Sequence, residues 1–208
     1  MLNLRIYRQI WTVRPPPRYN AECPHCGSLE RHRLLSHCLQ RLRILSGSEN
    51  VLHFAPEACL SPIIEKKSAT YRTADLIPGR ASTVLNIEHI DLPDKSIDVV
   101  IANHILEHVD DRAALREIRR ILTDHGVFIV MIPIVEGWAK TYENPSIIGE
   151  AERDRHFGQS DHVRYFGRDF RNRVLSAGFS LEEFSCDGAE TVRYSLTRGE
   201  CVFIGRKA

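Results

Sequence analysis

Residues 91–133 contain an apolar run, a helical pattern and a second apolar run, and this order limits the possible folds more than any other feature of the chain. Ser96–Ala102 is almost continuously apolar, as in a central parallel strand that is buried on both faces. Val127–Ile132 is a second run of this kind. Two parallel strands joined by one helix form a β-α-β unit, so the stretch predicts an open α/β sheet.

The helix between these strands has a predicted beginning, apolar face and end. Asp110 or Asp111 suits the N-cap position, because a short carboxylate side chain accepts hydrogen bonds from the first free backbone N–H groups. One helical face carries Leu115, Ile118 and Leu122. Gly126 is expected to end the helix in the left-handed conformation.

A polar cluster follows the first of these strands and consists of Asn103, His104, Glu107 and His108. Ligands of open α/β sheets bind at the carboxyl ends of the strands, so the cluster predicts a ligand site. The letters HILEH also fit the H-x-x-E-H pattern of one class of zinc peptidases, whose two histidines lie on one helix. His104 directly follows a buried strand, before the capped helix, so the context favours a ligand-binding loop over a peptidase.

Composition and charge narrow the class of protein. The 208 residues are 43% hydrophobic and carry a net charge of +1, as expected for one globular domain with an N-terminal extension. Residues 1–50 hold eight arginines and three acidic residues, a net charge of +5, and the remainder carries −4. The larger part therefore lacks the basic, aromatic groove of a nucleic-acid enzyme, and a nucleic-acid partner is not expected.

The sequence also suggests where the protein works. No apolar run approaches the ~20 residues of a membrane span, and the N-terminus lacks an apolar signal core. Six cysteines without a dense framework indicate reduced thiols. We therefore expect a cytoplasmic protein without a membrane partner.

The N-terminal residues predict an arm, a cysteine turn and a docking helix. Residues 1–22 begin with a short mixed segment and continue with RPPPRYN, whose three consecutive prolines favour an extended backbone and so predict an arm or linker. Cys23 and Cys26 form a C-x2-C pair closed by Gly27, the geometry of a zinc knuckle. Ser28 is expected to cap a helix with apolar residues at helical spacing, namely Leu34, Leu35, Cys38, Leu39, Leu42 and Leu45.

A structural zinc ion at the cysteine turn requires four ligands. The candidates near Cys23 and Cys26 are His25, His32, His37 and Cys38. Cys38 lies on the apolar face of the helix and is also explained as a core residue. A tight turn with two free thiols remains an alternative, and a redox pair lacks its usual β-α-β context here.

Three further features predict strands that end near the same site. Val51–Ala55 is a short apolar strand that leads into the glycine-free loop APEAC. Tyr71–Ala74 leads to Asp75, and nucleotide-binding α/β folds use a carboxylate at this distance to accept both ribose hydroxyl protons. Thr83–Ile87 fits a third strand that contains Asn86.

The chain after residue 133 leaves the sheet pattern and then returns to it. Residues 134–166 are rich in charged and aromatic residues, and insertions at this place often form substrate lids. A solvated surface loop is the alternative. Arg168–Ala177 predicts a helix that ends at Gly178, and two final strands are expected at Leu181–Cys186 and Glu200–Gly205.

The segments LPDKSIDVVIANHILEHVDD, ALREIRRIL and HGVFIVMIP, together with VLHFAPE, TADLIPGR and FGQSDHVRYFG, resemble the class I S-adenosylmethionine (SAM)-dependent methyltransferases. In particular they resemble small bacterial enzymes of the ubiquinone-biosynthesis type, and CPHCGSLERHR is similar to the N-terminal extension of some of them. The resemblance implies a Rossmann-like α/β fold with a seven-stranded, mostly parallel sheet, an antiparallel last strand and helices on both faces. It also implies an N-terminal extension at 1–48, a methyltransferase domain at 49–208 and a lid insertion at 134–166.

The resemblance also assigns site residues. The implied SAM-binding residues are Ala55, Pro56, Glu57, Asp75, Leu76, Asn86, Ile87, Asn103 and His104. The family has a glycine-rich loop where this chain has APEAC, and Glu57 lies near the expected position of the methionine amino group; helix capping is the alternative role. The family often has an aspartate at the position of Asn86, which can still accept a hydrogen bond.

The expected function is transfer of a methyl group from SAM to a small-molecule acceptor, such as a saccharide or a secondary metabolite. A hydroxyl acceptor would benefit from a general base, for which His104, His156 and His162 are the candidates. Two alternatives remain, a non-catalytic binding module, suggested by the glycine-free loop, and a methyltransferase directed at nucleic acid through the arginine-rich N-terminus.

Overall fold

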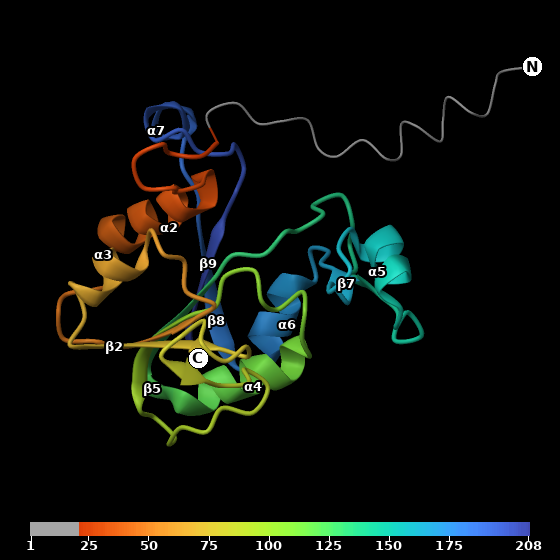
Figure 1. Ribbon diagram of the computed structural model, residues 1–208, viewed down its shortest axis with the longest axis horizontal. Coiled ribbons are helices and arrows are strands. Elements are labelled where there is room, and N and C mark those ends of the chain that lie inside the picture. The colour runs from red at the N-terminus through yellow and green to blue at the C-terminus, as the bar shows by residue number, and fades with distance from the viewer. Residues whose placement is uncertain (1–20) are drawn as a thin grey trace, which may run out of the picture.

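The computed structural model describes residues 21–208 (Figure 1). The arm predicted from the proline run lies outside these described residues. A single sheet of seven strands forms the centre, in the order β3-β2-β1-β4-β5-β9-β8. The strands are β1 Asn50–Phe54, β2 Thr70–Asp75, β3 Thr83–Val84, β4 Ile97–Ile101, β5 Leu122–Val130, β8 Phe179–Phe184 and β9 Val202–Lys207. Strands β1 to β5 pair in parallel, whereas β9 runs antiparallel to both β5 and β8. The predicted sheet is confirmed.

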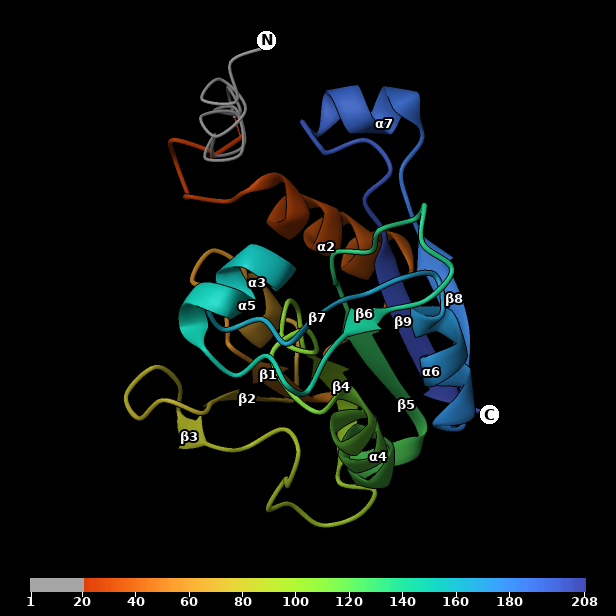
Figure 2. The same cartoon turned by 90° about the vertical axis from the view of Figure 1, so that its right-hand side faces the viewer.

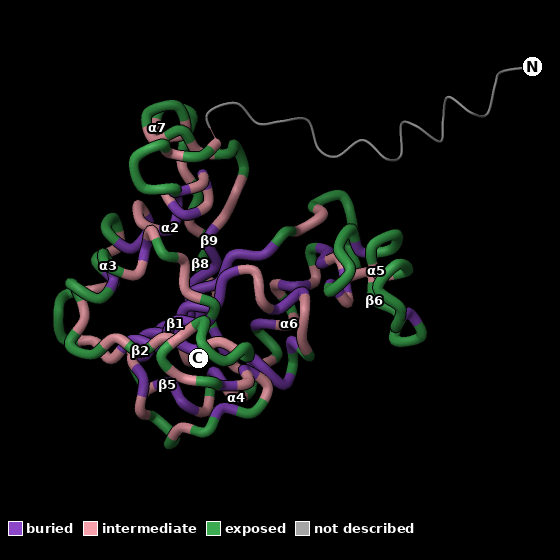
Figure 3. Tube along the Cα trace, viewed as in Figure 1, coloured by how far each residue is buried: buried purple, intermediate pink, exposed green. Residues whose placement is uncertain are grey.

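Helices cover both faces of the sheet (Figures 1 and 2). Helices α2 (Glu30–Arg41) and α3 (Ser61–Glu65) pack on one face, and α4 (Asp111–Ile121) and α6 (Phe170–Ser176) pack on the other. The buried residues accordingly form two hydrophobic clusters, one on each face, and Figure 3 shows burial concentrated in the central strands. Helix α7 (Gly188–Arg193) lies beside α2, and none of the described helices is long and apolar enough to cross a membrane.

The segment expected as an insertion stands apart from the main sheet. Its short strands β6 (Tyr142–Glu143) and β7 (Arg164–Tyr165) pair with each other in antiparallel orientation. Helix α5 (Glu150–Phe157) lies between them in the sequence. Figure 2 shows this unit in front of the carboxyl ends of the central strands. Its place is therefore that of a cover over the edge where the ligand site was predicted.

The predicted helix boundaries are partly confirmed. Asp110 is the N-cap of α4, and its Oδ1 atom accepts hydrogen bonds from Arg112 N (3.0 Å) and Ala113 N (3.1 Å). The prediction that Ser28 caps α2 is wrong, because Leu29 is the N-cap and the Nδ1 atom of His32 accepts its backbone N–H (3.1 Å).

The prediction that Gly126 ends a helix is also wrong. Helix α4 ends at Ile121 and passes directly into β5, so Gly126 lies inside a strand. The pairing register between β4 and β5 shifts at this place, and the chain packs tightly there. A Cβ atom on Gly126 would lie 2.9 Å from Leu122 Cδ2, so close approach rather than a left-handed turn requires the glycine.

Candidate functional site

Polar residues at the carboxyl ends of β1, β2 and β4 surround a cavity of about 380 Å³. Parallel strands end at the same edge of a sheet, which brings these separate segments together. Six predicted cofactor residues line the cavity: Ala55, Asp75, Leu76, Asn86, Ile87 and His104. Further lining comes from Phe54, Ile77, Leu85, Ile105, His108, Val109 and Asp161. Pro56, Glu57 and Asn103 belong to the same strand ends but do not line the cavity.

Ala55 shows how the loop turns without glycine. It adopts a left-handed conformation, with φ of +45°, and its backbone N donates to Ala74 O (2.8 Å). Alanine is uncommon in this region because its Cβ crowds the backbone, at a cost of ~1–2 kcal/mol. The loop after β1 thus makes a tight left-handed turn at an alanine.

Glu57 belongs to a polar chain that runs beneath the loop. Its Oε2 atom lies 2.8 Å from His53 Nε2, and its Oε1 accepts a hydrogen bond from Asn103 Nδ2 (3.2 Å). His53 Nδ1 in turn contacts Tyr71 OH (2.9 Å), which donates to Ser61 Oγ (2.9 Å). Burial raises the pKa of Glu57, but the contacts with His53 and Asn103 outweigh it and leave the pKa below its usual value. Glu57 is therefore a partly buried carboxylate, with its side chain 17% exposed, and this side chain does not cap α3.

Asp75 and Asn86 present polar atoms to the cavity after each makes one local hydrogen bond. Asp75 Oδ1 accepts from Ile77 N (2.8 Å), which leaves further acceptor capacity on the carboxylate. Asn86 Oδ1 accepts from Glu88 N (2.9 Å), so its amide group offers two N–H donors as well as a remaining lone pair. Both residues therefore lie where the family's ribose and adenine contacts are expected.

His104 occupies a strained position at the end of β4. Its φ is +52°, and its backbone N donates to Met131 O (2.8 Å). Its Nδ1 lies 3.3 Å from Oε1 of buried Glu107. Residues 103–110 form turns rather than a helix, so the helical geometry of a zinc peptidase is absent from this segment.

A second cavity of about 500 Å³ adjoins the first and shares His104 and His108 with it. It is also lined by Arg31, Glu107, Pro133, Phe157, Gly158, Gln159, His162 and Tyr165. His162 Nδ1 contacts the carbonyl of Phe157 (3.1 Å), and burial together with His108 lowers the pKa of His162. His156 lines neither cavity; its Nδ1 contacts Tyr142 OH (2.7 Å) instead.

Backbone and ion contacts bring the distant residue His162 to this place. Val163 N donates to Glu107 O (2.9 Å), and Arg164 Nη1 donates to Leu106 O (2.6 Å). Arg164 and Arg173 also share the carboxylates of Asp111 and Glu143. Residues 134–166, called the cover segment below, are therefore anchored to the loop after β4.

The cysteine turn lies beside a third cavity, of about 370 Å³. Gly27 N donates to Cys23 O (2.8 Å) and Cys23 N donates to Ser28 O (2.9 Å), which closes the turn. Cys23, Cys26, His32 and Cys59 all line this cavity, and Cys59 Sγ lies 3.2 Å from His32 Nδ1. Cys38 is fully buried in the core, where burial raises its pKa to about 12. Cys59 was not among the predicted ligands, because no local sequence pattern connects it to the turn.

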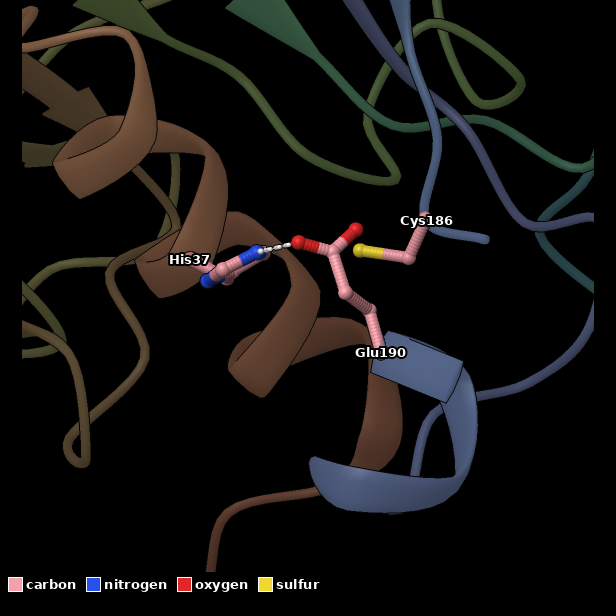
Figure 4. A group of neighbouring side chains, drawn as sticks. All are labelled: His37, Cys186 and Glu190. Atoms are coloured by element: carbon pink, nitrogen blue, oxygen red, sulfur yellow. Dashed lines mark hydrogen bonds and ion pairs between the residues drawn. The ribbon is translucent and has the colours of Figure 1, made fainter. Parts of the chain in front are cut away.

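His37 belongs to a different cluster, with Cys186 and Glu190 (Figure 4). His37 extends from α2, Glu190 from α7 and Cys186 from the segment before α7, and the three side chains point toward one another. His37 Nε2 lies 3.3 Å from Glu190 Oε1, and the His37 ring packs on Tyr194, with ring centres 4.5 Å apart. None of the three lines the first cavity, so this cluster joins α7 to α2.

Comparisons with known proteins agree with this architecture. Residues 47–130 match a family model described as a methyltransferase domain. The methyltransferase in the complex with the Haloferax volcanii Trm112 methyltransferase activator aligns with a TM-score of 0.60 and 17% identity, over 85% of this chain and 90% of that chain. The 1,6-didemethyltoxoflavin-N1-methyltransferase of Burkholderia thailandensis, solved with bound 1,6-didemethyltoxoflavin and S-adenosylhomocysteine, aligns with a TM-score of 0.58 and 15% identity, over 98% of this chain and 83% of that chain. At such identities the likeness shows the fold alone.

A curated relative matches only locally. An uncharacterised protein of Methanocaldococcus jannaschii is 45% identical over 47 residues, which are 23% of this chain. The match spans about a fifth of that protein's length, 21%.

The strand order, the antiparallel β9 and the cavity at the carboxyl ends of β1 and β2 define a class I methyltransferase fold. Residues 47–130 match the methyltransferase-domain model, and the solved SAM-dependent methyltransferases share this fold. The narrower subgroup with an N-terminal CPxCG extension stays a prediction.

Proposed function

We propose that the protein transfers a methyl group from SAM to a small-molecule acceptor. The observation that carries this proposal is the position of Asp75 at the end of β2, on the wall of a cavity that Ala55, Asn86 and His104 also line. These three residues follow three other strands and lie near the Asp75 carboxylate. This carboxylate retains acceptor capacity for two ribose hydroxyls.

The residues of the cavity fit this cofactor. Leu76 and Ile87 supply apolar walls for an adenine ring, and Asn86 supplies polar atoms at its edge. Beneath the loop, Asn103 is buried, and its Oδ1 has no hydrogen-bond partner among the described residues. Asn103 Nδ2 donates to Glu57 Oε1 (3.2 Å), and neither residue lines the cavity, so the pair holds the loop from beneath. Bound SAM supplies a sulfonium-activated methyl group.

The chain's own residues would then position the acceptor and remove its proton. His104 lines both cavities, so it lies between the cofactor and the space beneath the cover segment. Its contact with Glu107 (3.3 Å from Nδ1 to Oε1) orients the ring, which a general base requires. His162 also lines the second cavity, whereas His156 is directed to Tyr142.

The acceptor is proposed to be small, for example a saccharide or a secondary metabolite. Residues 134–166 lie over the second cavity and contribute Phe157, His162 and Tyr165 to its wall. A cavity of about 500 Å³ is within the usual range for small-molecule sites. The same segment would act as the substrate lid, since its strands β6 and β7 pair with each other rather than with the main sheet.

Calorimetric titration with SAM and with S-adenosylhomocysteine tests the proposal. Wild-type protein should bind both ligands, and Asp75→Ala should weaken binding at least tenfold through loss of the ribose acceptor. Asp91→Ala, at an exposed aspartate outside the cavity, is the matched control and should bind like wild type. Absence of saturable binding in folded wild-type protein would instead support a non-catalytic binding module, and salt-sensitive RNA or DNA binding would support a nucleic-acid substrate.

We further propose that Cys23 and Cys26 hold a structural zinc ion, with His32 and Cys59 as the other two ligands. Three thiolates and one imidazole are a common zinc ligand set, and all four side chains line one cavity. Cys59 lies two residues after Glu57, so zinc would tie the N-terminal helix to the cofactor loop.

Metal analysis of protein purified without chelator tests the zinc site. Wild type should contain one zinc ion per chain, and both Cys23→Ser and Cys59→Ser should lose it. Cys201→Ser, outside this cavity, is the control and should keep the metal. Zinc retained in Cys59→Ser, or none in wild type, would refute the four-ligand site.

A further inference from the structure

The second cavity contains ligand atoms of a kind that bind transition metals. One carboxylate oxygen of Glu107 and one ring nitrogen each of His108 and His162 lie within 4.8 Å of one another. Glu107 is 2% exposed, and its Oε2 atom is buried without a hydrogen-bond partner among the described residues. An unpaired buried carboxylate oxygen costs free energy unless a ligand satisfies it.

Neighbouring groups orient both imidazoles. The carbonyl of Phe157 can only accept a hydrogen bond, so His162 carries its proton on Nδ1 and leaves Nε2 free to coordinate. His108 Nδ1 lies 3.3 Å from Asp161 Oδ2, which in the same way leaves Nε2 of His108 as the ligand. Metal-binding histidines commonly donate their other N–H to a carbonyl or a carboxylate. The cluster has both arrangements.

We propose that Glu107, His108 and His162 bind a first-row divalent metal ion that holds an oxygen of the methyl acceptor. Two imidazoles and one carboxylate leave coordination positions open for substrate or water, and nitrogen ligands favour Fe²⁺ or Zn²⁺ over Mg²⁺. The site lies against the cofactor cavity, because His108 lines both. The acceptor role rests on the proposed methyl transfer; the metal site itself does not.

Such an ion would narrow the acceptor to a hydroxyl compound. Coordination lowers the pKa of a bound hydroxyl group. The hydroxyl proton passes to His104, the oxygen forms a bond to the methyl carbon, and the carbon–sulfur bond breaks with its electron pair retained by sulfur. Arg31 lines the same cavity, and its guanidinium suits an acceptor that carries an additional anionic group.

Binding of Mn²⁺ followed by electron paramagnetic resonance tests the metal site in the full chain. Mn²⁺ is suitable because it binds thiolates poorly and so avoids the cysteine turn. One ion should bind per chain at micromolar concentration. Glu107→Gln and His162→Ala should each weaken binding at least tenfold, whereas His125→Ala, at an exposed histidine of β5, should not change it. Far-ultraviolet circular dichroism confirms that each variant is folded.

The outcomes separate the metal site from the proposed function. Absence of Mn²⁺ binding, or binding unchanged in both ligand variants, would overturn the metal proposal while SAM titration still reports on the cofactor site. Tight Mn²⁺ binding in a protein that does not bind SAM would support the metal site and refute methyl transfer.

Discussion

Glu57 Oε2 lies 2.8 Å from Nε2 of His53, whose side chain is fully buried, directly beneath the loop that follows β1. This contact joins the first strand of the sheet to the candidate cofactor loop, and Asn103 extends it to the end of β4. Two strand ends that line one cavity are therefore held together by a partly buried carboxylate. This arrangement gives Glu57 a measurable role in stability that does not depend on catalysis.

Glu57→Gln should lower the free energy of unfolding by about 1–3 kcal/mol, because a hydrogen-bonded carboxylate is replaced by a neutral amide. In the folded state the contacts with His53 and Asn103 lower the pKa of Glu57 below its usual value of 4.5, so the carboxylate stabilises the protein above that pH. Its contribution is lost as the pH falls through the lowered value. Urea unfolding between pH 3 and 7 checks this. The difference in the free energy of unfolding between wild type and Glu57→Gln should become smaller below about pH 4.5. Glu65→Gln, at an exposed carboxyl of α3, is the control. An equal effect of both variants would contradict the prediction.

Ala55→Val should destabilise the protein by ~1–2 kcal/mol, because a β-branched side chain is strongly disfavoured at a φ of +45°. Ala55→Gly should be neutral or slightly stabilising, since glycine adopts this conformation without steric cost. Thermal and urea unfolding measure both. Ala58→Val, at an exposed alanine of the same loop without a positive φ, should have little effect. If Ala55→Val is as stable as wild type, the left-handed turn is wrong.

Arg173→Met should lower the free energy of unfolding by about 3–5 kcal/mol, because it leaves the buried Asp111 carboxylate with one weaker partner. Arg173 Nη1 lies 3.0 Å from Asp111 Oδ2, and Asp111 is 2% exposed. Lys95→Met breaks a 2.9 Å ion pair with Asp124 whose two side chains are mostly exposed, and should cost less than about 1 kcal/mol. Chemical unfolding of the two variants should therefore give clearly different midpoints.

Gly205→Ala should destabilise the core by about 1–3 kcal/mol, because the added Cβ would overlap the ring of Phe128 on the paired strand β5. That ring also packs on Phe179, with ring centres 4.9 Å apart, and has little room to move. Gly188→Ala, where the new Cβ meets nothing within 4 Å, should leave stability unchanged or raise it slightly. Differential scanning calorimetry measures the melting temperature of both variants. Equal melting temperatures would argue against the described packing of β5 against β9.

Local chemistry made much of the fold predictable. The apolar runs that became β4 and β5 are buried on both faces, and Asp110 caps α4 because its carboxylate reaches N–H groups two and three residues away. Asp75 could be singled out because it directly follows a strand, and parallel strands place such residues at one edge. The prediction for Gly126 is wrong because a helix stop and a close contact within one strand require the same residue for different reasons.

The sequence by itself determined the alternation of strands and helices, the edge at which the ligand site lies and the residue types available there, since these depend on contacts between near neighbours in the chain. Only the tertiary structure decided which distant side chains meet. His162 reaches Glu107 because Val163 and Arg164 bond to the loop after β4, and Cys59 reaches His32 because α2 and the cofactor loop pack together. Such contacts leave no periodic trace in the sequence, because they depend on the packing of whole elements.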